Sequence, residues 1–182
     1  MGRSSPSNPM SVDRSLRDVR IRRGEAEDFE PARAVLTSAA AWARDRGIDR
    51  WWPVPFPAER LRPALENGHL YVAESAGEIV ATLVFQWEDR RAWGEQPPVA
   101  GYVHLLAVRK DRPLKGLGEI LLAWAADRTR ENGRGLIRLD CLATNDGLVR
   151  YYEGIGFRRV RVAPHPVPGE TRGVQLFEKE VG

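Results

Sequence analysis

The sequence contains little cysteine, histidine or lysine. Its 182 residues include one cysteine, three histidines and only three lysines, which are Lys110, Lys115 and Lys179. One cysteine forms no intrachain disulfide, and with three scattered histidines it makes no metal-ligand cluster, so no metal is expected. The chain also lacks an apolar run of membrane length and an N-terminal secretory signal. These absences predict a cytoplasmic protein with no membrane partner.

The chain also lacks a large excess of charge of either sign. Lysine and arginine total 28 against 25 acidic residues, a formal net charge of +3, and arginines spread over the whole length supply most of the positive charge. A nucleic-acid binder would instead cluster arginines and interleave them with aromatic residues, so no nucleic-acid partner is expected. The 42% hydrophobic content and the length suit one α/β domain with a core of its own.

Local patterns set the domain limits and the element order. Residues 1–17 are rich in Ser, Pro and Arg without periodicity, which predicts a disordered tail before a single domain at 18–182. Hydrophobic periodicity, together with the Gly and Pro residues that mark turns, predicts the order of the elements. It is one strand, two helices, three strands, a helix, a strand, a helix and two strands. The segment 88–98 between the second and third of these central strands is predicted to be a polar loop.

The most informative segment is VHLLAVRKDRPLKGLGE, residues 103–119. An apolar strand runs into a loop with Gly116 and Gly118 and then into an amphipathic helix. Backbone N–H groups at a helix start, backed by the helix dipole, make an anion site that suits phosphate. Glu119 stands where a P-loop has lysine, and Leu121 stands where a dinucleotide fingerprint has a third glycine, so both of those loops are excluded. A plain strand-to-helix turn remains the alternative.

A second segment, NDGLVRYYEGIGF at 145–157, follows the next predicted strand. Together with VHLLAV and the KGLG loop, it resembles the GCN5-related N-acetyltransferase (GNAT) superfamily over about residues 19–182. The resemblance implies a mixed α/β sheet of about seven strands flanked by about four helices, with the central strands splayed around acetyl-CoA.

The resemblance also implies which residues hold the coenzyme. The glycine loop would bind the pyrophosphate, and the splayed strands and the helix start would hold the pantetheine arm. These residues are Leu106, Ala107, Val108, Arg112, Leu114, Lys115, Gly116, Leu117, Gly118, Glu119 and Asn145. One departure is Pro113, which stands where the family usually has Gln or Arg and which offers neither a side-chain donor nor an N–H.

Catalytic roles follow from the same resemblance. Tyr152 matches the tyrosine that protonates the departing thiolate, and its alternative is an aromatic ring packed under the coenzyme. His104 is the candidate base, acting through water on the substrate ammonium, and its alternative is a satisfied core histidine. A backbone N–H near Leu106, at a strand bulge, would hold the oxyanion. Asn145 would bind the pantetheine arm or cap the helix that follows it.

Aromatic and acidic residues mark the expected acceptor site. Trp51, Trp52, Trp87 and Glu88 fall in the two segments where the family grips its acceptor, and aromatics with carboxylates suit a cationic amine. The alternative is that the tryptophans close the core and the acid faces water. Cys141, inside an apolar run, is expected to be a small core residue rather than a nucleophile.

The predicted function is therefore acetyl-CoA-dependent N-acyl transfer to a primary amine by direct attack in a ternary complex. The alternative is a catalytically weak or inactive module that binds or senses acyl-CoA on the same fold, which Pro113 favours. The expected partner is an amine-bearing small molecule or peptide. Association of two copies of the chain as a homodimer is left open.

Overall fold

The computed structural model describes residues 16, 18–48, 52–111 and 114–182. The predicted tail therefore lies outside the described residues except for Leu16. Seven strands form one sheet in the order β1-β2-β3-β4-β5-β7-β6. They are β1 (Arg20–Arg23), β2 (Leu70–Ser75), β3 (Glu78–Gln86), β4 (Ala100–Val108), β5 (Leu136–Leu142), β6 (Arg158–Ala163) and β7 (Val174–Glu180).

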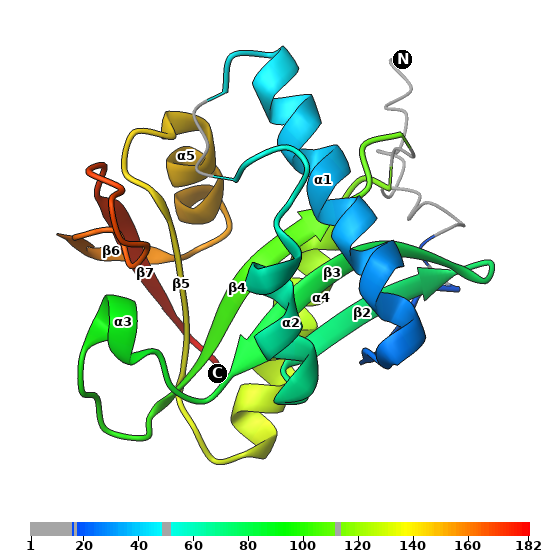
Figure 1. The fold of residues 1–182 in the computed structure, drawn as a ribbon. Helices are drawn as coiled ribbons and strands as arrows, with labels where there is room; N and C mark the ends of the chain where they lie inside the picture. The colour runs from blue at the N-terminus through cyan, green and yellow to red at the C-terminus, as the bar shows by residue number, and fades with distance from the viewer. Residues whose placement is uncertain (1–15, 17, 49–51, 112–113) are drawn as a thin grey trace, which may run out of the picture.

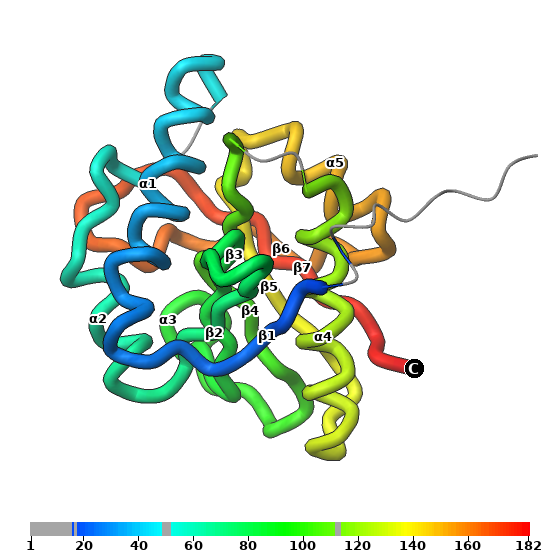
Figure 2. Tube along the Cα trace, turned by 90° about the vertical axis from the view of Figure 1, so that its right-hand side faces the viewer, coloured from blue at the N-terminus to red at the C-terminus, as the bar shows by residue number. Residues whose placement is uncertain are grey.

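The helices cover both faces of this sheet. They are the 3-10 turn η2 (Ala26–Asp28), α1 (Phe29–Asp45), α2 (Ala58–Glu66), α3 (Arg90–Trp93), α4 (Leu117–Glu131) and α5 (Asp146–Gly154). Seen edge-on, α1 and α2 lie on one side of the sheet and α4 and α5 on the other (Figure 2). The mixed α/β architecture is confirmed, and the predicted element order agrees with the structure apart from the short η2 and α3.

The segment predicted as a polar loop between β3 and β4 differs from the expectation in containing a helix. The short α3 begins at Asp89, whose side chain accepts a hydrogen bond from the Ala92 amide. This cap is a local interaction, but a four-residue helix is too short to show an apolar period in sequence. With α3, the described residues form five α-helices and one 3-10 turn instead of about four helices.

Two apolar layers hold the helices against the sheet. Phe29, Leu36 and Phe56 belong to the layer under α1 and α2, where they pack on β2 and β3. On the opposite face, Leu117 and Leu121 of α4 are fully buried in the larger layer. The sheet interior is therefore covered on both faces, as expected where parallel strands are joined through a helix.

The only parallel pair in the described sheet is β4 with β5, and this pair separates along its length. The paired residues run from Ala100 with Leu136 to Val103 with Leu139, although β4 continues to Val108 and β5 to Leu142. The two strands lie together at one end and diverge toward α5 (Figure 1). The predicted splay of the central strands is thus present.

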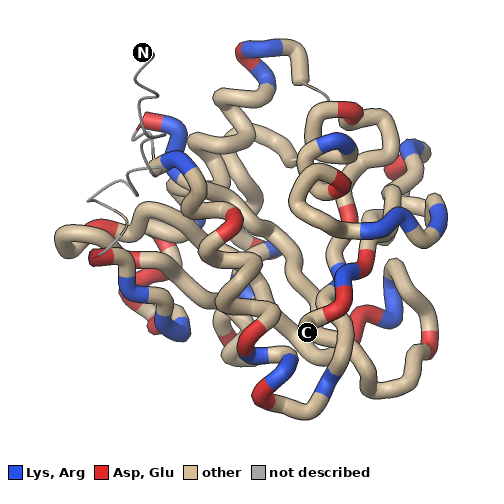
Figure 3. The backbone as a smooth tube through the Cα atoms, turned by 180° about the vertical axis from the view of Figure 1, so that it is seen from behind, with Lys and Arg blue, Asp and Glu red and all other residues tan. Residues whose placement is uncertain are grey.

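Charged residues of both signs are mixed over the surface. Seen from behind, Lys and Arg alternate with Asp and Glu along the helices and strand ends (Figure 3). Many form ion pairs between neighbours in the fold, such as Arg22 with Asp28 at 2.5 Å and Arg159 with Glu153 at 2.7 Å. None of the helices in the described ranges is long and apolar enough to cross a membrane.

Candidate active site

A β-bulge interrupts β4 where it separates from β5. Thr82 of β3 pairs with Ala107, and Val84 pairs with His104, so two steps along β3 match three along β4. The extra residue falls at Leu105, whose φ of +48° lies in the left-handed region that a leucine rarely adopts. A bulge frees backbone groups from the strand ladder, so main-chain donors become available beside the gap.

A cavity of about 1520 Å³ lies at this gap. Its walls include residues 103–108 of β4 and 139–142 of β5, together with parts of α1 and α2 from one face and of α5 from the other. A single small-molecule pocket usually measures about 300–1,000 Å³. The cavity is therefore large enough for two ligands that meet between the strands.

The glycine loop forms one end of this cavity. Gly116 is the N-cap of α4 and has a φ of +85°, a conformation that costs a glycine little. Gly118 and Glu119 follow in the first turn of α4, where N–H groups have no intrahelical acceptor and the helix dipole is positive. A β-carbon at Gly118 would lie 3.4 Å from the Tyr151 hydroxyl, so that phenol lies beside the loop.

Most of the predicted coenzyme residues line the cavity. They are Leu106, Ala107, Val108, Leu114, Lys115, Gly116, Gly118 and Asn145. Leu117 instead lies fully buried in the core, and Glu119 is not among the lining residues. Arg112 lies outside the described residues, as does the departure at Pro113.

Asn145 lies at the start of α5. Its side-chain oxygen accepts a hydrogen bond from the Leu148 amide at 3.0 Å, which caps the helix. The residue is 8% exposed and also faces the cavity. The capping alternative of the sequence analysis is therefore observed.

Tyr152 of α5 reaches the cavity from the face that α4 covers. Its ring contacts Phe157 and Phe177 at centroid distances of 5.8 and 5.5 Å, and the residue is 7% exposed. Burial, with smaller contributions from Cys141 and Asp140, raises the pKa of Tyr152 far above its usual value. The phenol is therefore protonated throughout the neutral range, as a proton donor must be.

His104 reaches the same cavity from β4, between two carboxylates. Its Nδ1 lies 3.4 Å from Asp140 Oδ1 on β5, and its Nε2 lies 3.5 Å from Asp89 Oδ2 at the start of α3. Burial lowers the pKa of His104, but Asp140 and Asp89 raise it by more, so the net shift is upward. These three residues also form a cluster of potential metal ligands among the described residues.

The predicted acceptor residues separate into two groups. Trp52 and Glu88 line the cavity, and Trp52 meets Phe56 edge-to-face with ring centroids 5.8 Å apart. Trp87 does not line it, because its ring packs on Phe85 and under the Arg134 guanidinium at 4.6 Å. Trp51 lies outside the described residues.

Cys141 is buried in β5 at 4% exposure, as a small core residue. Burial raises the pKa of its thiol to about 12, and Asp140 adds to the shift. Near neutral pH the thiol is therefore protonated, which makes it a poor nucleophile.

Sequence reasoning missed Asp140 and Tyr151, whereas Asp89 belongs to the acidic and aromatic segment in which the acceptor site is expected. Asp140 carried a signal, because it is an acidic residue in the otherwise apolar run at the end of β5. Tyr151 carried no such signal, because it is one of two adjacent tyrosines. Which of the two faces the glycine loop depends on how α5 packs against the rest of the fold.

The chain is similar to a known family and to several known proteins. The model of the acetyltransferase (GNAT) family matches residues 51–157. The uncharacterized N-acetyltransferase YesJ of Bacillus subtilis is 30% identical over 163 residues, 85% of this chain and 86% of that one. The N-alpha-acetyltransferase RimI of Mycobacterium tuberculosis is 29% identical over 63% of this chain and 65% of its own length. Mycothiol acetyltransferase of Rhodococcus jostii is 26% identical over 78% of this chain but only 45% of its own length.

Solved structures share the fold. A GNAT-family acetyltransferase of Listeria monocytogenes has a TM-score of 0.71 at 22% identity, covering 89% of this chain and 94% of that one. The yncA protein of Salmonella typhimurium, solved with its cofactor acetyl-CoA, has a TM-score of 0.61 at 17% identity, covering 90% and 94%. The family match extends over more than half of the residues and agrees with the YesJ relative, so this chain belongs to the acetyltransferase (GNAT) family.

Proposed function

We propose that this protein is an acetyl-CoA-dependent N-acetyltransferase. It would transfer the acetyl group to a primary amine of a small molecule or peptide by direct attack in a ternary complex. The observation that carries the proposal is the continuous cavity, which joins the glycine loop to Tyr152 on one face of the sheet and to His104 on the other. A thioester at the gap between β4 and β5 would lie between a proton donor and a proton acceptor.

The residues present suit the coenzyme. The left-handed Gly116 and the free amides at the start of α4 fit a pyrophosphate, and Lys115 adds a positive charge on the cavity wall. The bulge at Leu105 leaves Leu106 without a partner residue in the β3 register, so a main-chain N–H near Leu106 would stabilise a developing oxyanion.

The catalytic roles follow from the environments of the two residues. Tyr152 is buried and protonated, so it can give its proton to the departing thiolate and recover one from the amine nitrogen. His104 would remove the first proton of the substrate ammonium, because an amine attacks only when its lone pair is free. Trp52 and Glu88 on the cavity wall suit an acceptor with a cationic amine and an apolar body.

Thermal unfolding with and without acetyl-CoA tests the first requirement. A ligand present at one hundred times its Kd stabilises the folded state by about 2.7 kcal/mol, so the Tm is expected to rise clearly with millimolar acetyl-CoA. NAD+ serves as the control nucleotide. An unchanged Tm with acetyl-CoA would contradict the proposal.

Release of free thiol from acetyl-CoA tests catalysis. The amine panel includes an arylalkylamine, a polyamine, an aminoglycoside and a peptide with a free N-terminus. Thiol release with at least one amine is the expected result. Binding of acetyl-CoA without release by any amine would favour the alternative, an acyl-CoA-binding module that has lost catalysis.

A further inference from the structure

The two carboxylates beside His104 approach different ring nitrogens. Asp140 of β5 lies on the Nδ1 side at 3.4 Å, and Asp89 of the β3–β4 connection lies on the Nε2 side at 3.5 Å. Their side chains are only 11% and 7% exposed, and all three residues line the cavity. The imidazole is thus held between two nearly buried negative charges that come from separate parts of the sequence.

Two atoms of this cluster have no hydrogen-bond partner among the described residues. They are Asp89 Oδ2 and His104 Nε2, and both are buried. Their separation of 3.5 Å is too long for a good hydrogen bond. A buried carboxylate oxygen that lacks a donor is costly, so this position calls for a ligand that donates hydrogen bonds.

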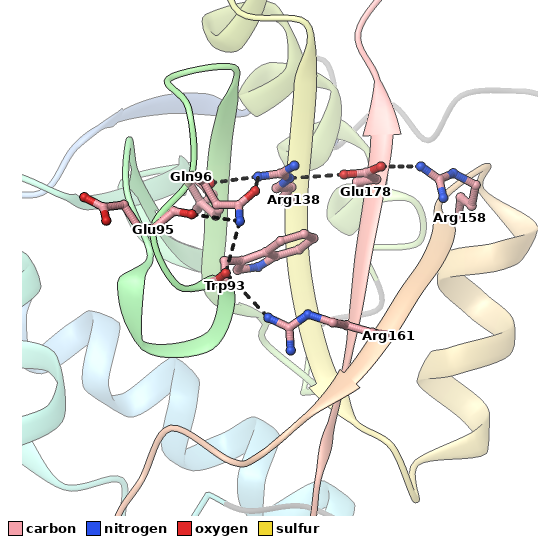
Figure 4. A network of polar contacts seen from close by, with 8 residues as sticks. Trp93, Glu95, Gln96, Arg138, Arg158, Arg161 and Glu178 are labelled. Carbon is pink, nitrogen blue, oxygen red and sulfur yellow. Dashed lines mark hydrogen bonds and ion pairs between the residues drawn. The ribbon is translucent and has the colours of Figure 1, made fainter.

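Asp89 is held in place without any ligand. Its other oxygen, Oδ1, accepts from the Ala92 amide and caps α3. The α3 segment is in turn fixed to the far strands, because Arg161 donates to the Ala92 and Trp93 carbonyls and Arg138 stacks over the Trp93 ring at 4.3 Å (Figure 4). The unpartnered Oδ2 is therefore preorganised, since its geometry does not depend on the ligand.

The charge of the cluster favours a cation. Two carboxylates with a neutral imidazole carry a charge of −2, and with a protonated imidazole they carry −1. The β3 residue opposite His104, Val84, is apolar, while Glu59 and Arg60 of α2 and Tyr152 of α5 face the same cavity. Burial lowers the pKa of His104, and the charged groups that raise it are Asp140 and Asp89.

We infer that Asp89 is the specificity-determining residue that selects an acceptor bearing a cationic ammonium group, and that Asp140 is a positioning residue that orients His104 to receive a proton from that group. This inference rests on the proposed N-acetyltransferase function. Asp140 on the Nδ1 side favours the tautomer that carries its proton on Nδ1, which leaves the lone pair on Nε2 facing the position beside Asp89. One N–H of the ammonium is donated to Asp89 Oδ2 and another to Nε2.

Proton transfer within the cluster conserves its charge. The ammonium gives one proton to His104 Nε2, so a neutral amine and an imidazolium form between the same two carboxylates. The amine nitrogen then bonds to the acetyl carbon as the C–S bond breaks. Its second proton replaces the one that Tyr152 gives to the thiolate. The products are the amide and CoA thiol, and the first proton leaves from His104 to solvent.

A divalent metal ion would be the competing occupant. One ligand atom from each of Asp89, His104 and Asp140 lies within 4.8 Å of the other two, although the two carboxylates approach opposite ring nitrogens. We assign the position to an ammonium group because Asp89 Oδ2 and His104 Nε2 can both accept hydrogen bonds, and an ammonium group donates them.

The first test compares Asp89→Asn with wild type on two acceptors. Asparagine keeps the capping oxygen but removes the charge. We use 2-phenylethylamine, which is cationic at pH 8, and its β,β-difluoro analogue, which is largely neutral there. The KM for 2-phenylethylamine is expected to rise at least about tenfold, and the KM for the analogue and for acetyl-CoA to change less than twofold. The control is Glu95→Gln, an exposed acid of the same connection that does not line the cavity.

The second test reads His104 directly, without turnover. NMR of protein with labelled histidine, assigned with His104→Gln, reports the imidazole pKa. Asp140→Asn is expected to lower this pKa, because Asp140 raises it in the wild type, and to move the acidic limb of the kcat profile down with it. A lower kcat without any change in the acidic limb of the profile or in the His104 pKa would mean that Asp140 only supports the fold. That result would overturn its role as a positioning residue.

The binding of 2-phenylethylamine, spermidine, kanamycin and a short peptide is followed on the same His104 signal. A shift with at least one cation in wild type that Asp89→Asn abolishes supports the inference. No shift with any of them at millimolar concentration, or activity that requires Zn²⁺ and is lost with EDTA, overturns it. Failure of the proposed function itself is recognised separately, by an unchanged Tm with acetyl-CoA.

Discussion

The guanidinium of Arg138 lies 4.3 Å from the centre of the Trp93 ring, so a charge buried in β5 stacks on an aromatic ring from the β3–β4 connection. The same guanidinium donates to Glu178 of β7 at 3.2 Å and to the Tyr102 hydroxyl of β4 at 3.0 Å. One side chain thereby joins three strands and α3 (Figure 4).

Arg138→Met is expected to lower the free energy of unfolding by about 2–4 kcal/mol, because it leaves nearly buried acceptors without their donor. Urea denaturation measures the loss. Arg158→Ala is the matched control, since Arg158 pairs with the same Glu178 but its side chain is 72% exposed. The control is expected to lose at most about 1 kcal/mol. Equal losses in the two variants would contradict a special role for Arg138.

Gly101→Ala is expected to destabilise the protein by about 1–3 kcal/mol. A β-carbon at this position would lie 2.4 Å from Thr129 Oγ1 and 2.7 Å from the Phe85 ring, and both side chains are buried. Gly135→Ala is the control, because a β-carbon there has no atom within 4 Å. Thermal unfolding of the pair gives the difference, and a Gly101→Ala variant as stable as Gly135→Ala would show that α4 moves away easily.

Gly116→Ala is expected to weaken acetyl-CoA binding as well as stability. The φ of +85° costs an alanine roughly 1–2 kcal/mol, and the strained loop would turn its amides away from the pyrophosphate. Gly77→Ala in the β2–β3 turn, at a φ of +78°, has a similar backbone cost far from the cavity. Isothermal titration with acetyl-CoA should separate them, and an equal Kd in both variants would remove the loop from the site.

Tyr152→Phe is expected to keep acetyl-CoA binding and to lower kcat by roughly 100-fold, the lower range for loss of a general acid. The neighbouring Tyr151→Phe serves for contrast. The Tyr151 hydroxyl lies beside Gly118, so its removal should change the Kd of acetyl-CoA more than the kcat at saturation. A Tyr152→Phe enzyme with wild-type kcat would exclude Tyr152 as the acid.

Cys141 is expected to be inert to thiol reagents in the folded protein. With burial raising its pKa to about 12, the thiol stays protonated at pH 8, whereas an ordinary cysteine is partly ionised there. Reaction with a chromogenic disulfide should be slow in buffer and should reach one thiol per chain in guanidinium chloride. Rapid reaction of the native protein would show that β5 opens at this position.

Patterns local in the chain determined much of this protein. Period-two and period-3.6 apolar repeats predicted most of the elements. The strands β4 and β5 were among them, because both are apolar runs between glycines and polar loops. The glycine loop and the tyrosine-bearing helix were also predicted from local patterns. Each motif is a short continuous segment, so no contact between distant residues is needed to recognise it.

Only the tertiary structure decided how distant residues meet. The bulge at Leu105 and the end of pairing after Val103 depend on two different strand partners, so no local signal marks them. Trp87 and Trp52 looked alike in sequence, yet Trp87 packs under Arg134 while Trp52 lines the cavity. Asp89 and Asp140 are 51 residues apart, and only the pairing of β4 with β5 and the anchoring of α3 bring both to His104. A side chain's type is local information, but the electrostatic environment that sets its chemistry belongs to the folded chain.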